Sequence, residues 1–470
     1  MWTSFRSSSR RIGFAGIGLM LVGDLTLAIA AEKLAPVDPR SIERGREFFL
    51  REWVPKDRRS HGGDGLGPVY NDRSCLGCHH QGPTGGGGGS AGVNIELISP
   101  IPAGGVSPGA PVFSYAFSFN YGPDGFEYRF GDPRGGNVFH GGRRPQATEP
   151  NVAELVRIHP GFREAPTVVL HRYGNDPDYR VWRDWVLGPH GNLSVRVSQR
   201  NPTPLFGLGL IDAIPDAAIE AAARRRHPGG SKVNGRVSRL SDGRIGRFGW
   251  KAQTATLRDF VVSAAAVEMG LEVPGKAQAA DPRVPPLKAP GLDMTLADCD
   301  DLVAFVHALP RPELVPPGRA REESARKAGR QLFRSTGCAD CHLERLGGVE
   351  GIYSDLLLHA MAPELADASL YGALLAEEKP AARVIPAGGL GRSTRPASTD
   401  EWRTPPLWGL RDSSPYLHDG RAGNLDEAIR MHGGEAESSA ARYRQLSSRE
   451  QALLQSFLVS LAAPDVPGLH

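Results

Sequence analysis

The sequence predicts a mainly α-helical fold in which one helical plan occurs twice, with loop-rich insertions in the first copy. Three observations lead to this prediction. The pentad Cys-x-x-Cys-His occurs at residues 75–79 and again at residues 338–342. A helical phrase that begins Gly-Arg precedes each pentad, at residues 45–49 and 329–333. The 58 glycines and 39 prolines predict long ordered loops rather than disorder, because 40% of the 470 residues are hydrophobic.

Two further phrases repeat after the pentads. Pro-Leu-Phe-Gly-Leu at residues 204–208 is matched by Pro-Leu-Trp-Gly-Leu at residues 406–410. Apolar residues at helical spacing over residues 302–309 and 454–461 predict that an amphipathic helix closes each copy. A first helix, a pentad loop and a last helix that crosses the first form a minimal wrapping for one flat, apolar macrocycle.

The chain divides into three predicted segments. Residues 1–30 contain three arginines, an apolar run and the small-residue sequence Ala-Ile-Ala, a pattern typical of a cleaved export signal. Residues 31–315 form the enlarged first copy and residues 316–470 the second, with prolines between residues 310 and 317 marking the linker. We therefore expect a periplasmic protein, which contacts the membrane only if the signal is retained. The net charge of +3 indicates no nucleic-acid partner.

The pentads predict two covalently bound haem c groups. Two thiols at this spacing can add across the vinyl groups of one haem, and the next histidine becomes the proximal iron ligand. The predicted residues are Cys75, Cys78 and His79 in the first copy and Cys338, Cys341 and His342 in the second. The same cysteine spacing would suit zinc or a redox dithiol, but the pentads start 263 residues apart (75 to 338), and a histidine adjoins each. Each copy is thus predicted to be a cytochrome c-type haem domain.

The insertion in the first copy predicts a β-hairpin. Aromatic residues alternate with other residues on both sides of the turn Pro123-Asp124-Gly125. They are Phe113, Tyr115, Phe117, Phe119, Tyr121, Phe126, Tyr128 and Phe130. Such a stripe near a haem could relay electrons, but packing is the more frequent use of aromatic residues.

The second copy resembles a known group most closely at residues 415–420 and 429–432. This stretch is similar to the bacterial di-haem cytochrome c peroxidase and MauG superfamily, whose members carry a Tyr-x-His-Asp-Gly segment. In that superfamily the C-terminal haem takes its distal ligand fourteen residues after the histidine of this segment. Counting from His418, the position is His432, so the resemblance implies ligation of the second haem by His342 and His432. Met431 is the competing ligand.

The first copy lacks an obvious distal ligand. Matching Ile219 to Ile429 places Ala222 opposite His432, and alanine cannot bind iron. The first haem is therefore predicted to be open on one face, where a small oxidant could bind. A rival alignment brings His227 to this position. Three histidines of the inserted region remain other candidates: His140, His159 and His171.

Several phrases narrow the resemblance to the branch called di-haem oxidoreductase, some members of which are labelled thiol oxidoreductases. These phrases are residues 64–68, 207–215, 246–252, 353–359 and 403–410. Thiol chemistry is not expected, because haem attachment consumes all four paired cysteines. The resemblance also makes calcium between the domains possible.

The resemblance implies a peroxidase. Electrons from a small cytochrome c or cupredoxin would enter at the C-terminal haem and pass to the N-terminal haem, where hydrogen peroxide is the expected small-molecule oxidant. Cleavage of the O–O bond needs a group that moves a proton, and in the superfamily this is a glutamate. Glu96, Glu127 and Glu149 are candidates by region alone. The alternatives are a haem-dependent oxygenase that oxidises an organic or protein substrate, and an electron-transfer cytochrome without catalytic activity.

Overall fold

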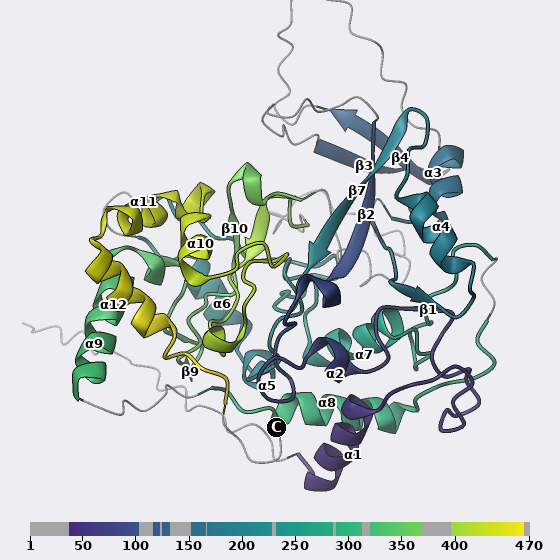
Figure 1. Cartoon of the computed structure of the whole chain (residues 1–470), viewed down its shortest axis with the longest axis horizontal. Helices are drawn as coiled ribbons and strands as arrows, with labels where there is room; N and C mark the ends of the chain where they lie inside the picture. The colour runs from purple at the N-terminus through teal and green to yellow at the C-terminus, as the bar shows by residue number, and fades with distance from the viewer. Residues whose placement is uncertain are drawn as a thin grey trace, which may run out of the picture.

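The computed structural model describes residues 37–102, 116–122, 125–131, 152–165, 167–227, 232–284, 288–312, 320–367 and 396–464. Helices are the most frequent regular structure among these residues, and the sheets are few and small (Figure 1). The predicted export signal lies outside the described residues. In the part of the chain that the structure describes, no helix is both long and apolar enough to cross a membrane.

The helices are α1 (Pro39–Leu50), α2 (Cys75–Cys78), α3 (Val152–Ile158), α4 (Tyr179–Val186), α5 (Leu208–Asp212), α6 (Asp216–Ala223), α7 (Leu257–Glu268), α8 (Leu296–Ala308), α9 (Ala320–Ser335), α10 (Leu425–Arg430), α11 (Glu437–Gln445) and α12 (Ser448–Leu458). The strands are β1 (Val69–Tyr70), β2 (Ile95–Pro102), β3 (Ala116–Gly122), β4 (Gly125–Gly131), β5 (Val168–Val169), β6 (Tyr173–Gly174), β7 (Leu193–Arg200), β8 (Arg345–Leu346), β9 (Val349–Glu350), β10 (Leu358–Ala360) and β11 (Glu401–Arg403).

Two helix pairs form equivalent frames, α1 with α8 and α9 with α12. A glycine makes each close contact possible. A Cβ atom on Gly45 would lie 1.9 Å from the carbonyl oxygen of Asp301, and one on Gly329 would lie 2.0 Å from that of Leu453. Glycine inside a helix costs about 0.5–1 kcal/mol relative to alanine. The close approach of the two backbones explains why both copies carry it.

Side-chain caps define where the closing helices begin. At the start of α8, the Thr295 hydroxyl accepts from the Asp298 amide, while the Asp298 carboxylate accepts from the Thr295 amide. Ser447 and Glu450 form the same capping box at the start of α12. Each box satisfies backbone donors that the first turn of a helix leaves unpaired. The two closing helices thus begin by the same device.

The insertion forms a sheet region in the first copy, drawn at the upper right of Figure 1 beside α3 and α4. β2 lies between β5 and β7, and both neighbours are antiparallel to it. β3 and β4 form a second antiparallel pair in which Phe119 stands opposite Tyr128. Six of the predicted aromatic residues fall on these two strands, Phe117, Phe119, Tyr121, Phe126, Tyr128 and Phe130, whereas Phe113, Tyr115 and the turn residues 123–124 lie outside the described residues.

The two copies meet through their repeated phrases. Gly207 has a φ of +71° and a Cβ there would lie 2.5 Å from the ring of Trp408; Gly409 has a φ of +68° and a Cβ there would lie 3.3 Å from the ring of Phe206. The aromatic residue of each phrase therefore covers the glycine of the other. Both glycines are needed, because a left-handed backbone and an aromatic face leave no room for a side chain.

Candidate functional site

The second pentad lines a narrow cavity of about 270 Å³. Cys338, Cys341 and His342 lie on one side, and His432 at the end of α10 lines the same cavity. Nδ1 of His342 donates to the carbonyl oxygen of Tyr353 at 2.9 Å, and burial lowers the pKa of this histidine to about 4. The imidazole is therefore neutral at physiological pH, with Nε2 left as the atom that can bind a metal.

His432 lines the same cavity as His342, and its ring is also held through Nδ1 by a backbone carbonyl. Its Nδ1 donates to the carbonyl oxygen of Ala428 at 2.7 Å, one turn back in α10, and burial lowers its pKa. The neighbouring Met431 is 40% exposed and does not line the cavity. Of the two ligands that the sequence left in competition, the structure brings His432 to His342.

The first pentad lines a much wider cavity of about 1330 Å³. Ser74 caps α2, which carries Cys75 and Cys78, and His79 follows. Nδ1 of His79 donates to the carbonyl oxygen of Gly86 at 3.0 Å, and burial lowers the pKa of His79 to about 4. This proximal arrangement matches that of His342.

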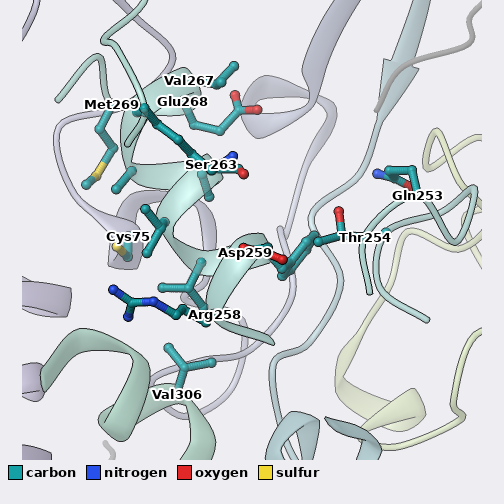
Figure 2. A pocket seen from close by; sticks show the side chains of 18 of the residues that line it. Cys75, Gln253, Thr254, Arg258, Asp259, Ser263, Val267, Glu268, Met269 and Val306 are labelled. Carbon is teal, nitrogen blue, oxygen red and sulfur yellow. The ribbon is translucent and has the colours of Figure 1, made fainter. Parts of the chain in front are cut away.

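Helix α7 forms a wall of the wide cavity. Figure 2 shows Cys75 beside α7, from which Arg258, Asp259 and Glu268 project, with Val306 of α8 nearby. The described residues that line this cavity include no histidine besides His79, although Met269 is among them. The two pentads thus lie in cavities of different size and different ligand content.

The other candidate distal histidines are engaged elsewhere. Nδ1 of His227 lies 3.3 Å from a carboxylate oxygen of Asp340, which belongs to the second pentad, so the rival alignment brings it to the wrong copy. Nδ1 of His159 accepts from the Gly161 amide, and Nε2 of His171 donates to the carbonyl oxygen of Val267 at 2.8 Å. None of these three lines the wide cavity, and neither does Ala222. His140 lies outside the described residues.

The residues present fit haem better than zinc or a dithiol. Each of His79, His342 and His432 presents Nε2 after its Nδ1 has been satisfied by a backbone carbonyl, as a histidine ligand to iron requires. Burial raises the pKa of Cys75 and of Cys78 to about 12, which makes them poor thiolate nucleophiles. Among the described residues, Cys341 forms a group of three potential metal ligands with Asp355 and His359, one short of a structural zinc site, and the other pentad residues are not part of it.

The three glutamates that the sequence proposed for proton transfer are not brought together. Glu96 on β2 forms an ion pair with Arg183 of α4 and does not line the wide cavity. Glu127 lies on β4, where only the backbone is described, and Glu149 lies outside the described residues. The carboxylate that sequence reasoning missed is Glu268, which lines the cavity and accepts from Nδ2 of Asn71 at 2.6 Å. No motif surrounds Glu268 in the sequence, so spacing alone could not have found it.

The residues that line both cavities come from the first copy. Asn201, Thr203 and Trp250 line both cavities. Trp408 lines the narrow one, and its indole N–H has no hydrogen-bond partner among the described residues. Arg403 also lines the narrow cavity; burial lowers its pKa to about 10, and its Nε donates to the carbonyl oxygen of Gly249.

His418 does not touch His432. Its ring stacks on Trp402 with centroids 3.7 Å apart, and Trp402 also lies 3.5 Å below the ammonium group of Lys251. Burial and the nearby cations lower the pKa of His418 to about 2. The Tyr-x-His-Asp-Gly segment therefore packs the boundary between the copies, because the main-chain amide of Asn201 also donates to the carbonyl oxygen of His418 at 2.7 Å.

A second buried cluster lies at the edge of the narrow cavity. His359 on β10 lies between Asp355 and Glu435, and its Nδ1 is 3.7 Å from Sγ of Cys341. Burial alone would lower the pKa of His359, but its hydrogen bonds with Asp355, Cys341 and Glu435 raise it strongly. Both ring nitrogens face carboxylates, so His359 is an imidazolium that donates on both sides.

No curated protein matches the chain. Among solved structures, Kuenenia stuttgartiensis hydrazine synthase under xenon pressure is 19% identical over 56% of this chain and 73% of that chain, with a TM-score of 0.29. A MauG-like protein associated with microbial copper homeostasis is 18% identical over 54% of this chain and 90% of that chain, with a TM-score of 0.28.

The model of the family described as "Di-haem oxidoreductase, putative peroxidase" matches residues 289–461. These residues run from before α8 to the end of the second closing helix and include the pentad at residues 338–342, together with His359 and His432. The match confirms the family that the sequence motifs predict. Over residues 289–461, the chain is therefore similar to the di-haem oxidoreductase family.

Proposed function

We propose that the protein is a periplasmic di-haem c-type oxidoreductase that reduces hydrogen peroxide at the N-terminal haem with electrons received through the C-terminal haem. A bound haem would supply an iron that accepts and donates single electrons. Cys75 and Cys78 would hold the first haem and Cys338 and Cys341 the second, with His79 and His342 as proximal ligands.

The observation that carries this proposal is the difference between the cavities. His432 faces the narrow cavity of His342, which supports a saturated iron suited to electron transfer. No second histidine lines the described part of the wide cavity of His79, which supports an accessible iron. Substrate binding is assigned to the first site and electron entry to the second.

The wall shared by the cavities supports the direction of electron flow. Trp250 lines both cavities, and Trp408 lies where the copies exchange their aromatic residues. Donors of electrons, a small cytochrome c or a cupredoxin, would dock near the second haem, where Met431 is exposed beside His432. Electrons would then cross a boundary made of side chains from both copies.

Proton transfer is assigned to Glu268. Its carboxylate lines the wide cavity and is oriented by Asn71, while Glu96 is neutralised by Arg183. A carboxyl group beside the open site can deliver a proton to a departing oxygen and accept one from the attacking peroxide. The half-buried position of Glu268 lets it exchange protons with solvent between turnovers.

Spectra of the oxidised protein test the proposal directly. One high-spin and one low-spin haem are expected in low-temperature electron paramagnetic resonance, together with oxidation of a reduced cytochrome c or cupredoxin when peroxide is added. Entirely low-spin spectra would contradict an open first site, and a histidine–methionine signal would identify Met269 as its sixth ligand.

The same preparation separates the two other functions. Oxidation of an organic or protein substrate by oxygen, without donor turnover, would identify an oxygenase. Two low-spin haems that exchange electrons but do not react with peroxide would identify an electron-transfer cytochrome.

A further inference from the structure

His359 connects the two segments that hold the second haem in the proposed function. Its Nε2 lies 2.9 Å from Oδ2 of Asp355, and its Nδ1 lies 2.8 Å from Oε2 of Glu435. The same Nδ1 is 3.7 Å from Sγ of Cys341. Cys341 belongs to the pentad, and Glu435 follows the distal His432 by three residues. One buried side chain therefore touches the proximal loop and the segment that carries the distal histidine.

The sequence His-Gly-Gly-Glu at residues 432–435 brings Glu435 to this place. A Cβ on Gly433 would lie 2.3 Å from Cβ of Ala362, and a Cβ on Gly434 would lie 2.3 Å from the carbonyl oxygen of Ala360. Gly434 also has a φ of +58°, which disfavours other residues. The chain after His432 therefore lies directly against the end of β10 and turns its next side chain toward His359.

The Glu435 carboxylate is fully used in this position. Oε1 accepts from the amide of Ala360 at 3.0 Å, and Oε2 accepts from the amide of Asn234 at 2.7 Å as well as from His359. The Glu435 side chain is only 15% exposed, so water competes little for these bonds. Asn234 comes from the first copy, so this carboxylate also ties the distal segment to the other half of the molecule.

By contrast, among the described residues the ring of His432 is held by one hydrogen bond, from Nδ1 to the carbonyl oxygen of Ala428. That bond fixes the ring plane, but it runs only to α10, the short helix that ends two residues before His432, and does not tie this segment to the rest of the cavity. The rigid connection to the proximal loop runs through Glu435. Charge-assisted hydrogen bonds of this kind are stronger than neutral ones.

We propose that Glu435 is a positioning residue that, through His359, keeps His432 on the iron of the second haem. The inference rests on the proposed ligation of that haem by His432. Without the carboxylate, the glycine pair loses its anchor on β10 and the imidazole can leave the iron. The vacated iron would then bind an external ligand, and the contrast between the two haems would be lost.

Carbon monoxide binding to the reduced holoprotein tests this role independently of turnover. In the unaltered protein, carbon monoxide should bind the first haem alone. In Glu435→Ala, both haems should bind it, and the oxidised protein should show a second high-spin signal. Glu435→Gln keeps an oxygen that can accept from a backbone amide, so it should restore much of the low-spin signal. Glu437→Ala, two residues on at an exposed position that pairs with Arg444, is the matched control and should behave like the unaltered protein.

A His432→Ala variant distinguishes failure of the inference from failure of the proposed function. If His432→Ala leaves the second haem closed to carbon monoxide, His432 is not the ligand and the proposed ligation is wrong. If His432→Ala opens the second haem while Glu435→Ala and His359→Gln leave it closed, the positioning role is wrong. Should Glu435→Ala yield no folded holoprotein by circular dichroism, the milder His359→Gln decides, and a second haem that stays closed to carbon monoxide in this variant would overturn the role.

Discussion

The two copies share one frame and differ in one helix. The ring of Phe49 lies 5.1 Å from that of Phe305 in the first frame, and the ring of Phe333 lies 5.3 Å from that of Phe457 in the second; both pentad histidines donate Nδ1 to a backbone carbonyl. The helix after the repeated phrase differs. α10 carries His432 into its own cavity, whereas α6 packs against the second copy, with Ala218 close to Gly347. The difference teaches that the shared frame positions the pentad histidine, whereas the helix after the repeated phrase determines whether a second histidine enters the cavity.

The largest effect is expected when one pentad is removed. Cys75→Ser with Cys78→Ser should abolish covalent attachment at the first site, halve the covalent haem content and eliminate peroxide reduction, while the low-spin signal of the second haem remains. Haem staining after denaturing electrophoresis and a pyridine haemochrome assay measure this. Cys299→Ser is the control, because Cys299 is buried in α8 away from both pentads. Retained turnover in the double variant would show that the open site is not the first one.

Removal of the proposed proton-transfer group should have the next largest effect. Glu268→Gln should lower kcat for peroxide about 100-fold, since general acid–base catalysis contributes at least this much, and should leave both haem spectra unchanged. Stopped-flow measurement of donor oxidation checks it. Glu96→Gln, which alters a carboxylate already paired with Arg183, should change kcat little. If Glu96→Gln lowered kcat more than Glu268→Gln, the proton-transfer role would belong to Glu96.

The ion pair between Arg236 and Glu401 joins the two copies, and it predicts how folding stability depends on pH. Burial alone would raise the pKa of Glu401, but Arg236 of the first copy and the amide of Ser398 lower it to about 2. Because the folded pKa is depressed, this carboxylate stabilises the fold above pH 4.5, and the contribution is lost as the pH falls from about 4.5 to about 2. Glu401→Gln should therefore cost at most about 3 kcal/mol at neutral pH, and the difference from the unaltered protein should vanish near pH 2. Thermal unfolding at several pH values measures both; a pH-independent difference would contradict this assignment.

The smallest expected effects test the equivalence of the frames. Gly45→Ala and Gly329→Ala should each destabilise by about 1–3 kcal/mol, because a methyl group cannot fit between the crossing backbones. Calorimetry should show similar losses in the two variants. Glu47→Ala, an exposed change in α1, is the control. A large loss in one variant alone would mean that only one of the two crossings is needed for folding.

The sequence was informative wherever chemistry depends on adjacent residues. The pentads and the glycine phrases before them could be found by counting, and the structure places them as equivalents around two cavities, whereas His432 was implied by the family resemblance. Residues 353–359 were among the phrases that carry the family resemblance, but no role could be assigned to them from the sequence. The structure gives the reason, because His359 at the end of this phrase meets Glu435, a contact across 76 positions that no local pattern encodes.

The distal side of the first cavity could not be predicted in the same way. α7 and Glu268 enter it after a long insertion, and no spacing relates them to His79. The rival distal ligand His227 was plausible by alignment, yet it lies near Asp340 of the opposite copy because α6 turns outward. Contacts between copies depend on how two frames dock, and the sequence of either frame contains no direct signal for that.

The reciprocal packing of Phe206 and Trp408 on the glycines of the opposite copy points to an evolutionary origin of the two copies. A ring from each half covering the glycine of the other is the self-complementary contact of a twofold-symmetric homodimer. Such a contact would arise if an ancestral single-haem subunit already paired with itself before its gene was duplicated and fused. Specialisation of the halves would then have started from an assembled dimer, in which one subunit could lose its sixth ligand while its neighbour kept the supply of electrons.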